Sequence, residues 1–223
     1  MTETPPAPPP PSAGEVGTGP RLFVCFEGGD GAGKSTQVRL LAAALERAGR
    51  QVLVTRQPGG TPLGAQIREL VLHGDHVSPR AEALLFAADK AHHVDELIRP
   101  ALAGGRVVIT DRYTDSSIAY QGAGRDLGAD EIRQLQHWAV GGLFPDLTVL
   151  LDVSPDVGRS RRGEVHDRLE SEADDFHAAV RQGFLDLAAR EPDRYLVVDA
   201  GLPADQIHRR VLARLGPILG ASA

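Results

Sequence analysis

Short apolar runs and longer mixed segments alternate along the whole chain, and this alternation predicts its secondary structure. Continuous apolar runs are typical of strands that a sheet buries on both faces. Such runs predict strands at residues 22–26, 51–55, 106–110, 147–153 and 194–198. The segments between them predict helices at 37–49, 65–72, 78–103, 115–121, 129–140, 155–162, 173–190 and 205–219. Because strands alternate with helices throughout, the pattern predicts an α/β fold with a mostly parallel sheet and right-handed crossovers.

Composition narrows the class of protein. At 223 residues the chain is long enough for one well-buried domain. Its formal net charge of −6 argues against a broad nucleic-acid-binding surface, so we expect no nucleic-acid partner. No apolar run approaches the ~18–20 residues of a membrane span, so we expect no membrane partner. The single cysteine, Cys25, is expected to be a small core residue, which favours a reducing compartment and a cytoplasmic location.

The first twenty residues differ from the rest. Residues 1–20 are rich in Pro and Gly and almost without large apolar side chains, so they cannot bury enough surface to fold. We expect a disordered tail there, partly in polyproline II form, followed by one domain at 21–223. The tail lacks the basic start and apolar centre of a signal peptide. Recognition as a PxxP ligand is an alternative role for it.

The segment RLFVCFEGGDGAGKST, residues 21–36, carries the most specific motif. The phosphate-binding loop G-x-x-x-x-G-K-[ST] is matched at Gly28, Gly33, Lys34 and Ser35. Glycines let several backbone N–H groups point at one anion, and the following helix aims its positive end at the same point. Lys34 is expected to reach the β- and γ-phosphates, and Ser35 to bind Mg²⁺. The alternative, a glycine turn without a ligand, fits the flanking strand and helix less well.

Charged residues also follow the second and third predicted strands. Arg56 opens the turn TRQPGGTPLG, and Asp111 and Arg112 follow the strand at 106–110. In open parallel sheets, ligands bind at the carboxyl ends of the strands. A carboxylate there can lie near Mg²⁺, and an arginine can hold a phosphate with two hydrogen bonds. These positions favour a ligand site over a solvated arginine and a surface Asp–Arg pair.

Three arginines lie close together near the end of the predicted helix at 155–162. Arg159, Arg161 and Arg162 fall within four residues. They form either a solvated basic helix end or a lid that closes arginines over phosphates, and the residues alone leave both readings open. Other sites find no support, because zinc-ligand spacing, G-x-S-x-G and G-x-G-x-x-G at the first loop are all absent.

Several segments, taken in order, resemble the thymidylate kinase family. They are FEGGDGAGKST, TRQPGGTPLG, LLFAADKAHHV, VVITDRYTDSSIAYQGAGR, LLDVSPDVGRSRR and DRLE, and the likeness runs from about Leu22 to Leu215. The resemblance implies the three-layer fold of P-loop NTPases, of the nucleoside monophosphate kinase kind, with a five-stranded parallel sheet. It also implies transfer of the γ-phosphoryl group of ATP to dTMP, with Mg²⁺ as cofactor, by a homodimer.

The resemblance assigns roles to the matching positions. The expected ATP-binding residues are Gly28, Gly29, Asp30, Gly31, Ala32, Gly33, Lys34, Ser35 and Thr36. The expected dTMP-binding residues are Arg56, Pro58, Phe86, Lys90, Arg112, Ser117, Tyr120 and Gln121. The expected metal region comprises Ser35, Asp111 and Asp30. The expected catalytic residues are Lys34, Asp30, Arg112, Arg159, Arg161 and Arg162.

Within these sets, the resemblance places the phosphate of dTMP between Arg56 and Arg112. Phe86 would stack on thymine, and Tyr120 would pack where a ribose 2′-hydroxyl would go. The family supplies its catalytic arginine from the phosphate loop or from a lid. No arginine lies between Gly28 and Lys34, so the lid, at about 156–168, is implied here, without an indication of which arginine acts.

Two positions depart from the family pattern. Gln57 replaces the usual glutamate after Arg56, and we expect the lost charge to leave that arginine freer for phosphate. Lys90 replaces the arginine that reads the thymine edge. It is one of only two lysines, Lys34 being the other, in a chain with 24 basic residues. A lysine offers a point charge where arginine offers a planar fork, so we expect weaker discrimination against dUMP.

Three other functions compete with this one. The nearest is a kinase for another nucleoside monophosphate or for a deoxynucleoside. A P-loop switch or partition ATPase belongs to a different class and would not need the second-substrate residues Phe86, Tyr120 and Arg112. A catalytically weak homologue is disfavoured because Lys34 and Asp30 are retained.

Overall fold

The computed structural model describes residues 21–161 and 167–220, so the predicted tail at 1–20 and Arg162 lie outside the described residues. The strands are β1 (Leu22–Glu27), β2 (Val52–Arg56), β3 (Val107–Asp111), β4 (Leu147–Asp152) and β5 (Tyr195–Asp199). The helices are α1 (Lys34–Arg47), α2 (Pro62–Arg68), α3 (Pro79–His93), α4 (Arg99–Ala103), α5 (Thr114–Ser117), α6 (Ala129–Ala139), α7 (Pro155–Arg161), α8 (Asp174–Arg190) and α9 (Ala204–Gly220). The π-helical segments are η1 (Glu69–His73), η2 (Val94–Ile98) and η3 (Ile118–Gly124).

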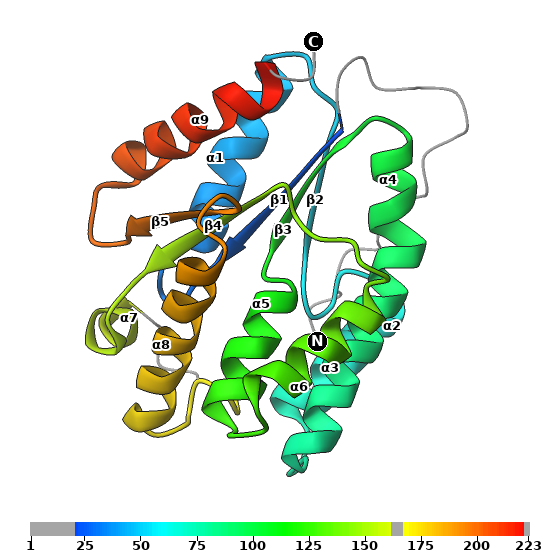
Figure 1. The fold of residues 1–223 in the computed structure, drawn as a ribbon, viewed down its shortest axis with the longest axis vertical. Helices are drawn as coiled ribbons and strands as arrows, with labels where there is room; N and C mark the ends of the chain where they lie inside the picture. The colour runs from blue at the N-terminus through cyan, green and yellow to red at the C-terminus, as the bar shows by residue number, and fades with distance from the viewer. Residues whose placement is uncertain (1–20, 162–166, 221–223) are drawn as a thin grey trace, which may run out of the picture.

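The described strands form one parallel sheet in the order β2-β3-β1-β4-β5, with β1 at its centre (Figure 1). The strand register pairs Phe26 with Asp111, and Asp111 with Arg56. The carboxyl ends of β1, β2 and β3 therefore meet at one edge of the sheet. The predicted α/β fold with a five-stranded parallel sheet is confirmed. This edge brings the loop after β1 close to charged residues that are distant in sequence.

Helices cover both faces of the sheet, which gives three layers (Figure 1). Val24 and Phe26 of β1 pack with residues of α1 and α9 on one face. Phe23 and Cys25 point to the other face, where residues of η2 and α4 cover them. Alternate residues of a strand point to opposite faces, so burial on both faces explains the continuous apolar run of β1. Cys25 is a buried core residue, as expected.

The predicted helix at 78–103 is divided in the structure. It comprises α3, the wider turn η2 and α4. η2 lies just before Pro100, whose ring removes one N–H donor from the helix. Ser78 is the N-cap residue of α3 and Pro79 is its first helical residue, but the Ser78 side chain makes no capping hydrogen bond. Hydrophobic periodicity does not distinguish a π turn from an α turn, so the sequence did not predict η2.

The buried face of α3 is strongly polar. Four of its side chains, Glu82, Asp89, Lys90 and His93, are each no more than 2 % exposed. Leu84, in contrast, is 58 % exposed. Buried polar groups need partners from other elements, so this face of α3 marks the region where a polar site is built.

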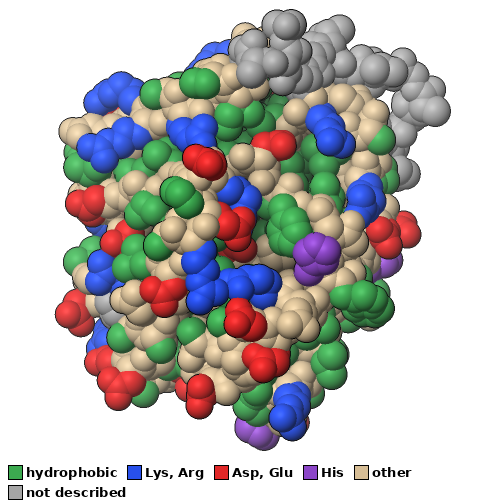
Figure 2. Space-filling model, in the orientation of Figure 1, with side chains coloured by type: hydrophobic (Ala, Val, Ile, Leu, Met, Phe, Trp, Pro, Cys, Tyr) green, Lys and Arg blue, Asp and Glu red, His purple; other side chains and the backbone are tan. Residues whose placement is uncertain are grey.

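Charges of both signs are interspersed on the face drawn in Figure 2, which shows acidic and basic side chains side by side. The positive charge that an anionic ligand needs must then come from local groups. Among the described residues, no helix is both long and apolar enough to cross a membrane.

Candidate active site

The loop after β1 has the backbone shape of a phosphate-binding loop. Gly31 and Gly33 have φ angles of 77° and 91°, in the left-handed region that favours glycine. Lys34 begins α1, and its Nζ donates to the carbonyl oxygens of Gly28 and Gly29 at 3.0 and 2.9 Å. The sequence therefore folds here into a glycine loop that holds a buried ammonium group at the positive end of a 14-residue helix.

A hydroxyl and a carboxylate meet beside this loop. Ser35 Oγ, in the first turn of α1, donates to Asp111 Oδ2 at 2.9 Å. Both are hard oxygen ligands of the kind that Mg²⁺ prefers, and Mg²⁺ is usually held by one or two protein groups together with substrate phosphates. In the described part of the chain, no group of three or more His, Cys, Asp or Glu residues gathers into a metal site. The donor set therefore fits Mg²⁺ bound with a nucleotide.

Asp30 lies at the tip of the loop and is held by two side chains of the turn and helix after β3. Arg112 donates to Asp30 Oδ1 at 2.5 Å, and the Tyr120 hydroxyl donates to Oδ2 at 3.1 Å. Burial alone would raise the pKa of Asp30, but the charges of Arg112 and Lys34 and these hydrogen bonds hold the pKa well below its usual range. Asp30 is therefore an anion that fixes the Arg112 guanidinium beside the loop.

One hollow, which we term the loop hollow, opens at this edge of the sheet. Its lining includes the loop and four arginines: Asp30, Gly31, Gly33, Lys34, Ser35, Thr36, Arg56, Gln57, Arg68, Asp111, Arg112, Arg161 and Glu170. Sequence analysis did not single out Arg68. Its guanidinium donates to the carbonyl oxygen of Pro58 at 3.2 Å, and burial together with the charge of Arg56 lowers its pKa. The clustered cations make this hollow suited to an anion with several charges.

A second hollow, the α3 hollow, adjoins the first and has a volume of about 130 Å³. Its lining is Asp30, Gln57, Pro58, Arg68, Leu72, Phe86, Lys90, Arg112, Tyr113, Ser116, Ser117, Tyr120, Gln121, Asp167, Leu169 and Glu170. Of the eight residues expected to bind dTMP, every one except Arg56 lines it, and Arg56 lines the loop hollow. Asp30 and Arg112 belong to both hollows.

Lys90 lies at the wall of the α3 hollow and is 2 % exposed. Its Nζ donates to Ser117 Oγ at 2.8 Å and to the carbonyl oxygen of Phe86 at 3.4 Å, and lies 5.4 Å from the centre of the Phe86 ring. Burial lowers its pKa to about 8, against the opposing charges of Asp89 and Glu27. The hollow thus pairs an aromatic face with a cationic donor.

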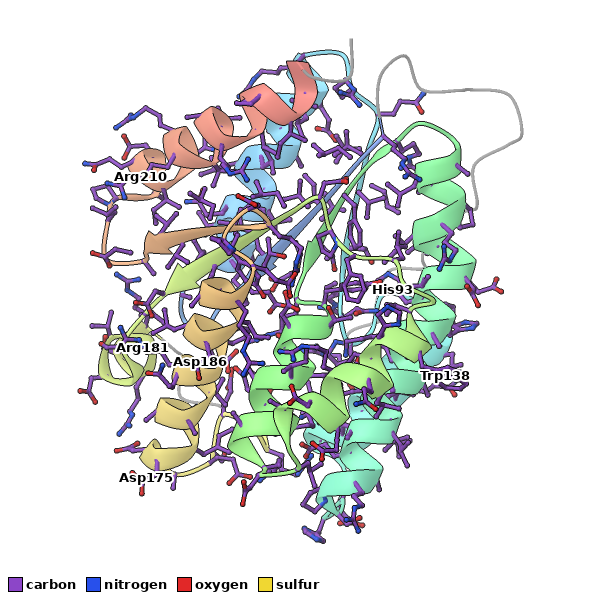
Figure 3. The ribbon with its side chains drawn as sticks, in the orientation of Figure 1. His93, Trp138, Asp175, Arg181, Asp186 and Arg210 are labelled. Carbon is purple, nitrogen blue, oxygen red and sulfur yellow. The ribbon has the colours of Figure 1, made fainter. Side chains whose placement is uncertain are left out.

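Gln57 has a buried partner that its position in the sequence does not reveal. Its side chain is 3 % exposed, and its Nε2 lies 2.7 Å from Nδ1 of His93, a residue of α3 labelled in Figure 3. The other ring nitrogen of His93 lies 2.7 Å from Thr55 Oγ1. Burial lowers the pKa of His93 to about 4, so the ring is neutral at physiological pH. These contacts tie the end of β2 to α3, and the expected effect of Gln57 on Arg56 stays a prediction.

A buried carboxylate orders the far end of the α3 hollow. Glu82 accepts hydrogen bonds from Gln121 at 2.9 Å and from Arg125 at 3.3 Å, and it pairs with Arg168. Arg168 also donates to the carbonyl oxygen of Val71 at 2.9 Å. Glu82 thus anchors the segment that follows residues 162–166. The sequence analysis missed it, although an acid in an apolar helix was a signal that it needs partners.

α7 packs closely on the phosphate loop. A Cβ atom added to Gly31 would collide with the carbonyl oxygen of Gly158 in α7, and one added to Gly158 would lie 2.6 Å from the carbonyl oxygen of Asp30. The backbone of the phosphate loop is therefore in direct contact with the backbone of α7. The base of the predicted lid at 156–168 is thus seated beside the loop that it was expected to cover.

The structure separates the arginines expected in the lid. Arg161 lines the loop hollow, and its guanidinium donates to the carbonyl oxygen of Ala200 at 2.8 Å. Arg159 pairs instead with Asp174 of α8, on the surface. Arg162 lies outside the described residues. Of these two described arginines, Arg161 lines the loop hollow and Arg159 does not.

Fold and site together define a class. A phosphate loop on a five-stranded parallel sheet, joined through Asp30 and Arg112 to a hollow with an aromatic face and a buried cation, is the arrangement of a P-loop nucleoside monophosphate kinase. The sequence model of the family described as thymidylate kinase matches residues 26–211. The chain belongs to the thymidylate kinase family.

Individual relatives agree with the family match. The chain is 57 % identical over 206 residues to the thymidylate kinase of Clavibacter sepedonicus, covering 91 % of this chain and 98 % of the relative. It is 57 % identical over 201 residues to that of Leifsonia xyli, covering 88 % and 95 % of the two chains. The crystal structure of thymidylate kinase from Ehrlichia chaffeensis superposes with a TM-score of 0.73 at 33 % identity, over 88 % of this chain and 99 % of the other.

Proposed function

We propose that the two hollows hold the two substrates of one reaction, with the phosphates of ATP in the loop hollow and dTMP in the α3 hollow. Thymidylate kinases transfer the γ-phosphoryl group of ATP to dTMP, and membership of the family gives this chain the same reaction. The observation that carries the placement of the substrates is that Asp30 and Arg112 line both hollows. Donor and acceptor phosphates would meet at this pair of residues.

The phosphates of ATP would be bound by the backbone of the loop and by Lys34. The N–H groups at the start of α1 have no partner within the helix and are available to an anion. Lys34 already lies against the loop backbone through its bonds to Gly28 and Gly29, so a short movement would bring its ammonium group to a phosphate. The proposed ATP-binding residues are those expected from the sequence, Gly28 to Thr36.

The base of dTMP would lie between Phe86 and the donors at the end of the α3 hollow. Phe86 supplies a flat apolar face, and Lys90, Ser117 and Gln121 supply polar groups at the same wall. Tyr120 would pack against the deoxyribose, because its hydroxyl is held by Asp30 at the centre of the site. This arrangement suits a pyrimidine whose edge accepts hydrogen bonds.

The phosphate of dTMP would lie where the two hollows join. Arg56 and Arg112 are the proposed clamp, and Arg68 is a third candidate, since it lines both hollows. Arginine is suited to this role because its planar fork donates two parallel hydrogen bonds to phosphate.

Mg²⁺ would be held by Ser35 and Asp111, with Asp30 lining the same hollow. When bound, Mg²⁺ would neutralise charge on the phosphates of ATP. The contribution of the chain is to place a hydroxyl and a carboxylate within hydrogen-bond distance at the ends of α1 and β3. Asp30 serves chiefly to orient Arg112, because its two oxygens accept hydrogen bonds from Arg112 and Tyr120, which belong to the proposed dTMP site.

Positioning and charge stabilisation would supply most of the catalysis. The transition state of phosphoryl transfer is loose and spreads charge over the equatorial oxygens. Lys34 and Arg112 both line the loop hollow, and Arg161 would add a third positive charge from α7. The attacking oxygen of dTMP is already anionic, so no strong general base is required.

We further propose that the enzyme is a cytoplasmic homodimer. Large apolar side chains are exposed on three helical segments, with Leu70 55 % exposed in η1, Leu84 58 % in α3 and Trp138 80 % in α6. Trp138 projects outward at the edge of the molecule in Figure 3. Exposed apolar side chains of this size fit burial against a second copy better than contact with water. Sedimentation of the Leu84→Glu variant beside the native chain would check the assignment.

A substrate panel tests the proposed function. ADP release from ATP and Mg²⁺ would be measured with dTMP, dUMP, dGMP and CMP as acceptors. The proposal expects the highest kcat/KM with dTMP and little ADP release without an acceptor. Faster turnover with dGMP or CMP would indicate another nucleoside monophosphate kinase. ADP release that no acceptor increases would indicate a switch ATPase.

A further inference from the structure

Glu27 is the last residue of β1 and is fully buried, although it is charged. Its Oε1 accepts hydrogen bonds from the backbone N–H groups of Tyr113 and Ser116 at 2.8 and 3.1 Å. Its Oε2 accepts the Ser116 hydroxyl at 2.6 Å. Tyr113 lies in the turn that connects β3 with α5, Ser116 lies in α5 itself, and the turn between them and β3 carries Arg112.

The backbone of Arg112 has a conformation that side chains rarely adopt. Its φ angle is 67°, in the left-handed region that is sterically unfavourable for residues other than glycine. Its N–H donates to the carbonyl oxygen of Phe26 at 2.9 Å, and its own carbonyl oxygen accepts the Thr110 hydroxyl at 2.9 Å. Strain of this kind persists only where surrounding bonds determine the conformation. The hydrogen bonds that Glu27 accepts from Tyr113 and Ser116 fix the backbone that follows Arg112.

The same carboxylate reaches the side chain of Arg112 through one hydroxyl. Arg112 Nη1 donates to Ser116 Oγ at 3.0 Å, and Ser116 Oγ donates in turn to Glu27. Burial and the nearby Asp115 raise the pKa of Glu27, while Arg112 and the hydrogen bonds from Ser116 and Tyr113 oppose that rise. Glu27 and Arg112 are thus linked through the backbone, through a hydroxyl and through charge.

We propose that Glu27 is a positioning residue for Arg112. It holds the turn in the left-handed conformation that directs the guanidinium to the junction of the two hollows, and it does not itself touch substrate. The inference rests on the role proposed for Arg112 in binding the phosphate of dTMP. A glutamate at the end of an apolar strand is otherwise only a buried charge with its hydrogen bonds satisfied, and the two roles predict different kinetics.

A double-mutant cycle separates the two roles. Glu27→Gln keeps the size of the side chain and removes its charge, and it should lower kcat/KM for dTMP by roughly 10- to 100-fold, the scale of a misplaced catalytic group. The dissociation constant for ADP should stay within about twofold, because the phosphate loop is unchanged. In an Arg112→Ala background, Glu27→Gln should cause no further loss in kcat/KM. Losses that multiply in the double variant would overturn the proposal, as would an equal loss in ADP affinity.

Two further variants complete the experiment. Ser116→Ala removes the linking hydroxyl but leaves both backbone bonds to Glu27, so it should cause a smaller loss that also disappears in the Arg112→Ala background. If Glu27→Gln does not fold, Ser116→Ala tests the proposal in its place. Asp146→Asn is the matched control, because Asp146 accepts from the N–H of Phe23 at 2.7 Å at the opposite end of β1; it should leave kcat/KM unchanged.

The cycle also distinguishes the inference from the proposed function. If Arg112→Ala alone leaves kcat/KM for dTMP unchanged, then the role assigned to Arg112 is wrong and the inference falls with it. If Arg112→Ala causes a large loss and the losses multiply, then Arg112 keeps its role and only the positioning by Glu27 is wrong.

Discussion

Arg112 donates to Asp30 at 2.5 Å, and both residues line the loop hollow and the α3 hollow. Their side chains are only 16 % and 22 % exposed, so water screens the pair little. A carboxylate and a phosphate offer a guanidinium the same kind of oxygen acceptor. Asp30 therefore keeps the Arg112 charge at the point where donor and acceptor phosphates are proposed to meet.

Removing Arg112 should affect turnover much more than nucleotide binding. Arg112→Ala is expected to lower kcat about 10²- to 10³-fold, as for loss of one preorganised donor to transition-state charge. The dissociation constant for ADP should change by less than about threefold, since this side chain is on the acceptor side of the loop. Steady-state kinetics and calorimetric ADP titration check the two quantities. Equal losses in both would refute the assignment.

The two described arginines of α7 should differ in their effect on catalysis. Arg161→Ala is expected to lower kcat by at least about 10²-fold, because a lid arginine that stabilises transition-state charge contributes on the order of 10³–10⁵ in related enzymes. Arg159→Ala is the control, since Arg159 pairs with Asp174 at the surface, and it should stay within about threefold of the native enzyme. Single-turnover kinetics with dTMP would compare them. A large loss in Arg159→Ala, or in Arg162→Ala with Arg161→Ala unaffected, would reassign the catalytic arginine.

Much of the fold could be predicted from the pattern of apolar residues and glycines in short segments of the sequence. The apolar run of β1 and the glycine loop before α1 are specified by residues close together in sequence, so their positions were predicted correctly. The grouping of Arg56 with Asp111 also followed, because parallel strands end at one edge of a sheet. Hydrophobic periodicity predicts whether a segment is a helix or a strand. It does not reveal the i→i+5 hydrogen bonds of η2.

The parts of the site that were missed depend on contacts between distant residues. Glu82 meets Arg168, 86 positions along the chain, and Glu27 meets Ser116, 89 positions away. No local signal names such partners, although an acid within an apolar segment signals that some partner exists. Gln57 likewise reaches His93, 36 positions along the chain, and its position next to Arg56 does not reveal this contact.

Lys90 should weaken discrimination between dTMP and dUMP. Its single ammonium group bonds Ser117 and does not hold a base edge in a fixed plane as a guanidinium does. The ratio of kcat/KM for dTMP to that for dUMP should rise on the order of three- to tenfold in Lys90→Arg, below the roughly 10- to 200-fold that a methylene group can provide. Both constants would be measured in both enzymes at one pH. An unchanged ratio would show that Lys90 does not weaken this discrimination.

The same residue should give the enzyme an alkaline limit. Burial lowers the pKa of Lys90 to about 8, so the ammonium form dominates below that pH and is lost above it. If the charge assists base binding, kcat/KM for dTMP should fall as pH rises through about 8. In Lys90→Arg this fall should move to higher pH, because arginine stays protonated. Thymine itself loses a proton at high pH equally for both enzymes, so coinciding pH profiles would contradict the role of Lys90.

The stability of the folded chain should depend on the buried ion pair between Asp115 and Arg194. Asp115 accepts from Arg194 at 2.9 Å and from the Tyr195 hydroxyl at 2.6 Å, and it is 2 % exposed. Asp115→Ala leaves a largely buried guanidinium without this partner, which costs about 3–5 kcal/mol for pairs of this kind. At roughly 2–4 °C per kcal/mol, Tm should fall by about 6–20 °C. Asp205→Ala, which breaks an exposed pair with Arg209, should cost no more than about 0.5 kcal/mol. Similar Tm values for the two variants would show that the buried pair contributes no more than a surface one.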